Sequence, residues 1–217
     1  MKPIKIYIHL FEKGPWESFL EEKVSLMKTA GLWQRASEVI YCAHGNESAF
    51  KKLDGRVVLH NSVAPFNEQY TNRTIKQEVD LSTESFYLLR FHLKGINWIG
   101  HPDQQRVKEY ADLLNYHNIE RWQAAVEKLD QGYDLAGVNW VKNPWPHFIG
   151  NIWWASSDYI RQLPLLKAPH EVNFRQQIPG SHSWAIHDAE SWIGLGAACA
   201  WDLYRNTDQI GLHPDIN

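Results

Sequence analysis

The sequence lacks several features that would place it in a common class of protein. Cysteine is scarce, because Cys42 and Cys199 are the only two in 217 residues, which favours buried free thiols in a reducing compartment over a disulfide framework. No apolar run approaches membrane-spanning length, and the short, charged stretch 1–11 does not resemble a signal peptide. These absences predict a cytoplasmic protein without a transmembrane segment. Peripheral association with a membrane is allowed by the sequence but not required.

An excess of basic charge is also missing. The chain has 22 Lys and Arg against 25 Asp and Glu, and its longest basic run is Lys51-Lys52. A nucleic-acid-binding surface needs a basic stripe, so we expect no nucleic-acid partner. The phosphate-binding and dinucleotide fingerprints G-x-x-x-x-G-K-[ST] and G-x-G-x-x-G do not occur, and GSHSW at 180–184 is not the G-x-S-x-G elbow of hydrolases. No histidine pairs with a carboxylate at zinc-like i, i+4 spacing, so the sequence assigns no metal ligand.

Aromatic residues and histidine are abundant instead. The chain carries 11 Trp and 11 His, within a composition of 44% hydrophobic and 22% charged residues that is typical of a soluble globular protein. A chain of this length is expected to form a single domain over 1–217 with a substantial core.

Apolar, β-branched runs alternate along the chain with stretches of helical spacing. Strands are predicted over 5–10, 38–43, 56–60, 86–92 and 134–140, and helices over 16–27, 67–80, 107–114, 119–129 and 191–204. The run FYLLRFH at 86–92 is almost continuously apolar, as in a central strand covered on both faces. The alternation predicts an α/β fold with a central, mostly parallel sheet flanked by helices, in which 168–183 forms one long irregular loop.

The stretch His147–Pro164, HFIGNIWWASSDYIRQLP, changes character halfway. Residues 149–155 predict a buried strand, and the serines that follow can cap a short helix that ends before the final proline. Because successive side chains on a strand point to opposite faces, Trp153 and Trp154 cannot both enter the same core. One of them could face a cleft and stack on a sugar or a base, although adjacent tryptophans more often serve a core and an interface.

In open α/β sheets, ligands bind outside the carboxyl ends of the strands. The side chains that follow each predicted strand are therefore candidate ligand-binding residues. They are His9, Phe11, His44, Asn46, His92, Lys94, Gly95, Asn139 and Trp140, together with His147, Gly150 and Asn151 from the tryptophan tract. Lys94 followed by Gly95 suits an ammonium group and a free backbone N–H beside a phosphate, but such a pair is more often a plain turn.

Two carboxylates, Asp188 and Glu190, stand just before an apolar segment near the C-terminus. Capping and the helix dipole explain acidic residues at that place. The alternative is a general base that faces a cleft and accepts a proton from a sugar hydroxyl. The residues alone favour capping and leave the second interpretation open.

Several motifs together resemble a known family. FYLLRFHLKGI (86–96), YDLAGVNW (133–140), the tryptophan tract and AESWIG (189–194) occur in the same order as in small GT-A-like glycosyltransferases of bacterial surface-glycan gene sets. A glycosyltransferase domain of a large algal virus is similar. The resemblance covers about the last two thirds of the chain, and the tryptophan tract is its most specific part.

The resemblance implies a GT-A-like half-Rossmann domain that transfers a sugar from a nucleoside-diphosphate sugar, UDP-linked, to a hydroxyl of a glycan acceptor with inversion. His92, Lys94 and Gly95 would then lie near the donor's diphosphate. Gly150, Asn151, Trp153 and Trp154 would shape the sugar and acceptor side, and Glu190, with Asp188, would supply the catalytic base. The remaining candidates at the strand ends, His9, Phe11, Asn139 and His147, would contact the substrates.

The sequence departs from the GT-A pattern in one respect, because no D-x-D follows an apolar strand to hold a divalent metal. Either other groups hold Mn²⁺ or Mg²⁺, or Lys94 and histidines neutralise the phosphates, so metal dependence stays open. A second hypothesis fits the same absence: a non-catalytic carbohydrate-binding domain or a structural subunit of a glycan-assembly system. Such a protein would bind glycan without affinity for a nucleotide sugar.

Overall fold

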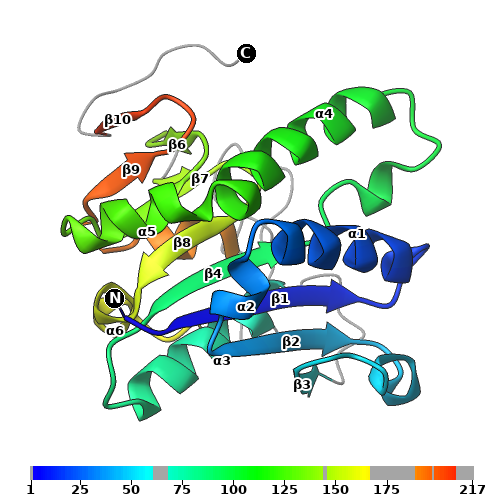
Figure 1. The fold of residues 1–217 in the computed structure, drawn as a ribbon, viewed down its shortest axis with the longest axis horizontal. Coiled ribbons are helices and arrows are strands. Elements are labelled where there is room, and N and C mark those ends of the chain that lie inside the picture. Colours follow the sequence, from blue (N-terminus) through cyan, green and yellow to red (C-terminus); the bar gives the residue numbers. More distant parts are fainter. Residues whose placement is uncertain (1, 61–67, 144–145, 167–188, 197, 209–217) are drawn as a thin grey trace, which may run out of the picture.

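The chain folds around an eight-stranded sheet with the strand order β10-β9-β5-β8-β4-β1-β2-β3 (Figure 1). The computed structural model describes residues 2–60, 68–143, 146–166, 189–196 and 198–208. The strands of this sheet are β1 (Ile4–Phe11), β2 (Glu38–His44), β3 (Arg56–His60), β4 (Tyr87–His92), β5 (Leu135–Gly137), β8 (Trp153–Ser156), β9 (Ala200–Asp202) and β10 (Thr207–Asp208). A separate hairpin pairs β6 (Trp140–Val141) with β7 (His147–Phe148).

The sheet is mostly parallel. β1 pairs in parallel with β2 and β4, β2 with β3, and β5 with β9, whereas β8 runs antiparallel to β4 and β5, and β10 antiparallel to β9. The chain moves outward from β1 through β2 to β3 and then returns to place β4 on the other side of β1. This reversal makes the carboxyl ends of β1 and β4 the topological switch point, where ligands bind in sheets of this kind.

Helices cover both faces of the sheet. In Figure 1, α1, α2, α4 and α5 lie on the near face, and α3 and α6 lie on the far side. Their bounds are α1 (Trp16–Thr29), α2 (Leu32–Arg35), α3 (Glu68–Leu81), α4 (Gln104–Asn115), α5 (Trp122–Asp130) and α6 (Ser157–Gln162), and a π-helical turn, η3 (Tyr116–Glu120), joins α4 to α5. No described helix has the length and apolar character needed to cross a membrane.

The alternation of side chains along each strand divides the core into two clusters. On β1, Ile6 and Ile8 join the cluster beneath α1 and α5, whereas Tyr7 joins the cluster beneath α3 and α6. The same alternation separates the two adjacent tryptophans of β8, since Trp154 belongs to the first cluster and Trp153 to the second. The prediction that they cannot both enter the same core is therefore confirmed.

Most of the predicted elements are present. The strands predicted over 5–10, 38–43 and 56–60 correspond to β1, β2 and β3, and the run at 86–92 forms β4 in the middle of the sheet. The short helix after the tryptophans begins as predicted, because the Ser156 hydroxyl accepts a hydrogen bond from the Tyr159 backbone N–H. The long loop predicted over 168–183 lies outside the described residues.

Three predictions about local structure are wrong. The strand predicted over 149–155 begins only at Trp153, and the one predicted over 134–140 ends at Gly137. The helix predicted over 191–204 is replaced by a 3-10 turn, η5 (Trp192–Gly194), and by strand β9. The two glycines in that segment disfavour a helix, and the buried Asp202 carboxylate accepts hydrogen bonds from the backbone N–H groups of Trp140, Tyr204 and Arg205.

Candidate active site

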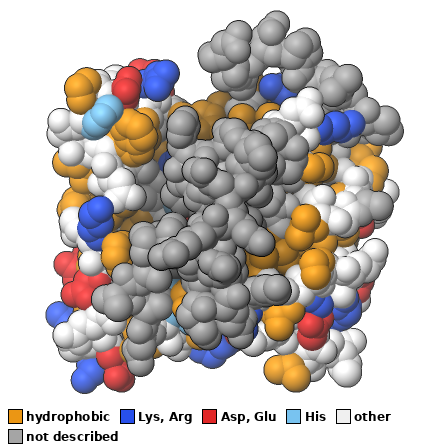
Figure 2. Space-filling view, turned by 180° about the vertical axis from the view of Figure 1, so that it is seen from behind, with side chains coloured by type: hydrophobic (Ala, Val, Ile, Leu, Met, Phe, Trp, Pro, Cys, Tyr) orange, Lys and Arg blue, Asp and Glu red, His pale blue; other side chains and the backbone are white. Residues whose placement is uncertain are grey.

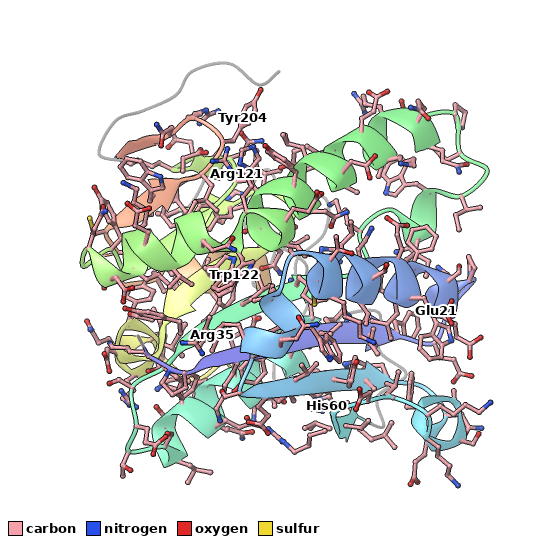
Figure 3. The ribbon with its side chains drawn as sticks, viewed as in Figure 1. Glu21, Arg35, His60, Arg121, Trp122 and Tyr204 are labelled. Carbon is pink, nitrogen blue, oxygen red and sulfur yellow. The ribbon has the colours of Figure 1, made fainter. Side chains whose placement is uncertain are left out.

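Histidines lie at or within two residues of the carboxyl ends of four neighbouring parallel strands, on the α3 side of the sheet. His9 on β1 pairs in register with His92 on β4, and His44 on β2 pairs with His60 on β3. The His44 ring lies 5.2 Å from that of His9 and 5.0 Å from that of His60, measured between centroids. Figure 3 shows His60 at the tip of β3, the outermost member of this row. The row marks the edge of the sheet where the candidate site lies.

Helix α3 packs against this row of histidines and contacts two of them through threonine hydroxyls. The Thr71 hydroxyl lies 2.9 Å from His9 Nδ1, and the Thr74 hydroxyl lies 3.2 Å from His60 Nε2. Burial lowers the pKa of the His9 and His60 imidazoles, so both rings are neutral near pH 7. In this state they donate or accept hydrogen bonds without carrying charge.

A buried ion pair holds the centre of the switch point together. Arg90 lies on β4 with its side chain fully buried, and its Nη2 donates to Glu68 Oε2 at 2.7 Å. The same carboxylate oxygen accepts a hydrogen bond from Asn151 Nδ2 at 2.6 Å. Arg90 Nη1 also donates to the Asn151 carbonyl. Glu68 at the start of α3 thus joins β4 to the loop that carries Gly150 and Asn151.

Positive groups keep Glu68 ionised. Burial by itself would raise the pKa of its carboxyl, but the neighbouring positive charges of Arg90, and of His92 when protonated, together with the Arg90 hydrogen bond, hold that pKa far below its usual range. Glu68 is therefore an ionised carboxylate that already accepts hydrogen bonds from Arg90 and Asn151. This arrangement suits a positioning role better than proton transfer.

His92 is fixed by the same loop. Its Nε2 donates to the Gly150 carbonyl at 2.8 Å, which leaves Nδ1 facing Glu68 Oε1 at 3.8 Å. Burial lowers the pKa of His92 to about 4, despite the opposing charge of Glu68, and the charges of Arg90 and Lys94 add to the lowering. His92 is thus a neutral imidazole whose proton sits on Nε2.

The backbone beside the switch point takes conformations that suit glycine and asparagine. Gly95 has φ +97° directly after Lys94, and Gly150 and Asn151 have φ +88° and +51°. A Cβ added to Gly150 would lie 3.1 Å from Leu114 and 3.7 Å from Lys94 Nζ. The loop therefore passes close to the Lys94 ammonium, and a side chain at position 150 would crowd it.

Glu190 approaches the site from a third segment. The Asn72 amide on α3 donates to the Ala189 carbonyl at 2.8 Å, and the Tyr159 hydroxyl on α6 donates to the Ile193 carbonyl at 2.7 Å. These bonds anchor the chain on both sides of Glu190. Burial raises the pKa of the Glu190 carboxyl, the Glu68 charge raises it further, and Lys94 and Arg90 act in the opposite direction. The carboxyl is thus a stronger base than an exposed glutamate.

Four further residues were predicted to contact the substrates or to act as a base: Phe11, Asn139, His147 and Asp188. Phe11 is 43% exposed at the end of β1. Asn139 is buried, and its amide lies 3.4 Å from the Tyr110 hydroxyl, which itself donates to the Ile149 carbonyl. His147 lies in the β6–β7 hairpin opposite Val141. Asp188 lies outside the described residues.

The tryptophans are not the platform that the sequence suggested. Trp153 and Trp154 are both 0% exposed, and their indole N–H groups donate within the protein to Asn151 Oδ1 and to the Asn118 carbonyl. No face of either ring remains for a sugar, because helices cover both sides of the sheet at β8. Trp153 acts indirectly, since its N–H orients the amide of Asn151 beside Glu68.

The sequence analysis missed Glu68 and Arg90, which organise the site. Arg90 could have been found, since a charge in the middle of an apolar strand must be paired when that strand is buried. The identity of its partner could not, because Glu68 begins a helix 22 residues earlier. Nothing in the local sequence around Glu68 signals this contact.

The described residues contain no group of three or more His, Cys, Asp or Glu side chains arranged to hold a metal ion. Glu68 already accepts hydrogen bonds from Arg90 and Asn151, and His92 donates to a carbonyl, so these groups do not fit the donor set of Mn²⁺ or Mg²⁺. Figure 2 shows the face opposite α1, where described hydrophobic side chains reach the surface.

The fold and site define an α/β protein with a mostly parallel sheet and a polar cluster at its switch point. Comparison with protein-family models gives no match, and no curated protein is significantly similar in sequence.

The buried histidines predict that the folded chain loses stability in mild acid. His92 protonates near pH 6.5 when unfolded and only near pH 4 when folded, so below pH 6.5 the unfolded state binds more protons. Between pH 7 and pH 5 this difference costs about 2 kcal/mol of unfolding free energy for His92 alone. The lowered pKa values of His9 and His60 act in the same direction, and the raised pKa of Glu190 acts against them. Urea titrations at the two pH values measure the loss.

His92→Gln provides the specific test, since the amide can still donate to the Gly150 carbonyl but does not titrate. We expect the loss between pH 7 and pH 5 to shrink by about 2 kcal/mol in this variant. His101→Gln, at an exposed position, is the matched control and should leave the loss unchanged. An unaltered pH dependence in His92→Gln would show that the imidazole is not held neutral by the fold.

Proposed function

We propose that the protein is a GT-A-like glycosyltransferase that transfers a sugar from a UDP-linked donor to a hydroxyl of a glycan acceptor with inversion, in the cytoplasm. The observation that carries the proposal is that Lys94, two residues after the end of β4 at the switch point, acts by its charge on the Glu190 carboxyl. Lys94 lies beside the Gly150 loop and is close enough to Glu190 to influence its pKa. A free ammonium group and a basic carboxylate in one place are what a displacement at a sugar diphosphate requires.

The order of the parallel strands supports the proposal. The sequence β3-β2-β1-β4 is that of the first half of a doubly wound nucleotide-binding sheet, and the ends of β1 and β4 form its crevice. Gly95, with its positive φ, turns the chain directly after Lys94 and keeps the backbone open for a phosphate. Within the described residues Lys94 makes no ion pair, so its charge is available to a ligand.

The proposed step is a single displacement. The Glu190 carboxylate accepts the proton of the acceptor hydroxyl while that oxygen forms a bond to the anomeric carbon of the donor. The bond from this carbon to the diphosphate oxygen breaks on the opposite side, and its electron pair leaves with UDP. Lys94 stabilises the negative charge of the departing diphosphate. Glu68, Arg90 and His92 hold the Gly150 loop in place and are not consumed in the step.

Binding of UDP tests the proposal at its first step. UDP or a UDP-sugar at about 100 times its Kd should stabilise the folded state by about 2.7 kcal/mol, which raises Tm by roughly 5–10 °C in a protein of this size. Thermal-shift measurements with and without Mn²⁺ also reveal whether a divalent ion contributes. Lys94→Ala should abolish the shift.

Lys108→Ala is the matched control, because Lys108 is an exposed lysine on α4 that pairs with Asp112 away from the switch point. This variant should retain the full shift. The proposal fails if no nucleotide raises Tm, or if Lys94→Ala responds as the unaltered protein does. A protein that binds glycans but no nucleotide would instead be the non-catalytic carbohydrate-binding domain.

A further inference from the structure

A cavity lies on the face of the sheet opposite α3, between α1 and the β2–β3 edge. It has a volume of about 630 Å³, within the range of roughly 300–1,000 Å³ that small-molecule sites occupy. We name it the α1 hollow. The side chains that line it include Trp33, Tyr41, Glu17, Glu21, Lys52 and Asp54. Figure 3 shows Glu21 on α1 at this side of the molecule.

The α1 hollow exists because one crossover lacks a helix. Parallel strands are usually joined by a helix that covers the sheet. Here the chain passes from β2 to β3 through residues 45–55, which contain only the 3-10 turn η1 (Glu47–Phe50). Tyr41 on β2, which is 1% exposed, therefore lines a cavity between α1 and the loop after η1.

The floor of the hollow is aromatic and carries one hydroxyl without a partner. Trp33 is half-buried, with Lys28 Nζ 5.4 Å from its ring centroid. The Tyr41 hydroxyl makes no hydrogen bond to the described residues, and burial, with the charge of Asp54, raises its pKa to about 12. It is therefore a neutral donor on a side chain that lines the cavity, although Tyr41 as a whole is only 1% exposed.

The rim carries charges of both signs that are not paired with each other. Within the described part of the chain, the side chains of Glu17, Glu21, Lys52 and Asp54 take part in no ion pair or hydrogen bond, although all of them line the hollow. Most charged side chains around a structural cavity would be expected to neutralise one another. These instead leave acceptors and donors free around an apolar floor.

We propose that the α1 hollow binds a neutral saccharide, with a sugar ring against Trp33 and its hydroxyl groups bonded to Tyr41 and to the rim. A sugar has apolar C–H faces and a rim of hydroxyls that can donate to carboxylates and accept from lysine. A charged ligand would oppose one sign of the rim, and an acyl chain would bury the charges without partners. The site does not depend on the proposed function, because it lies across the sheet from Glu190.

The test uses neutral tetrasaccharides of different linkage: cellotetraose, maltotetraose, chitotetraose and mannotetraose. Saturation-transfer NMR and calorimetric titration of the unaltered protein should show saturable binding of at least one of them. Trp33→Ala should weaken that binding by at least about tenfold. Tyr41→Phe removes one hydrogen bond and should weaken it by about three- to tenfold without disturbing the aromatic floor.

Trp98→Ala is the matched control, because Trp98 is a tryptophan 36% exposed in the 3-10 turn η2 (Ile96–Trp98) and is not part of the hollow. It should leave saccharide binding unchanged. The inference is overturned if no tetrasaccharide binds, or if Trp33→Ala and Tyr41→Phe bind as well as the unaltered protein. The UDP-induced shift in Tm reports on the site at Lys94 instead. A negative result for saccharide binding therefore does not affect the test of UDP binding, and the reverse also holds.

Discussion

Glu190→Gln should reduce sugar transfer by about 10²- to 10⁴-fold while leaving the affinity for UDP within a few-fold of the original. The amide keeps the size of the carboxyl but cannot accept a proton from the attacking hydroxyl, so only the chemical step is affected. UDP release from a UDP-sugar, with water or a glycan as acceptor, measures the step, and calorimetric titration with UDP measures binding. The raised pKa of Glu190 makes this carboxyl the basic group of the site.

Two controls separate a catalytic role from a structural one. Glu109→Gln removes an exposed carboxylate on α4 and should change neither the rate nor Tm. Glu190→Asp retains a base at a shifted position and should recover part of the rate. Transfer in the unaltered protein should also decline in acid as Glu190 becomes protonated, a dependence that the amide variant lacks. Unchanged transfer by Glu190→Gln would remove this residue from the mechanism.

The central strands could be predicted because burial on both faces produces a run of apolar residues in the local sequence. A strand covered on both faces is almost continuously apolar, and 86–92 shows this pattern at β4 apart from Arg90 and His92. Alternation likewise predicted that Trp153 and Trp154 cannot both enter the same core. Whether either of them reached a cleft depended on what α5, α6 and Trp192 cover, and this is decided by packing between segments far apart in the chain.

The centre of the site could not be predicted for a related reason. The strand-end rule located His9, His92 and Lys94, since each lies within two residues of the carboxyl end of β1 or β4. Glu68 enters only because α3 folds back over those ends and meets Arg90. A single sequence contains both residues but does not show that they are in contact. The side chains at strand ends can thus be predicted from the local sequence, whereas the residues that hold them in position are brought there by tertiary packing.

The contact between Glu68 and Arg90 should also be the most sensitive point of the fold. Glu68→Leu leaves the Arg90 guanidinium, which is 0% exposed, with only the Asn151 carbonyl as its described partner. Removal of one member of a buried ion pair typically costs 3–5 kcal/mol, and we expect about 3 kcal/mol because Glu68 is itself partly exposed. Tm should fall by roughly 6–12 °C. Urea titration gives the free energy of unfolding directly.

The double variant Glu68→Leu/Arg90→Met separates the loss of attraction from the cost of an unpaired charge. A buried charge without its partner is the larger part of the penalty, so removal of both charges should restore more than half of the lost stability. Asp112→Asn breaks the exposed Lys108–Asp112 pair and should cost less than about 0.5 kcal/mol. A loss below about 1 kcal/mol in Glu68→Leu would mean that water reaches Arg90. In that case the switch point would be an open, hydrated cleft, and the Gly150 loop would need another support.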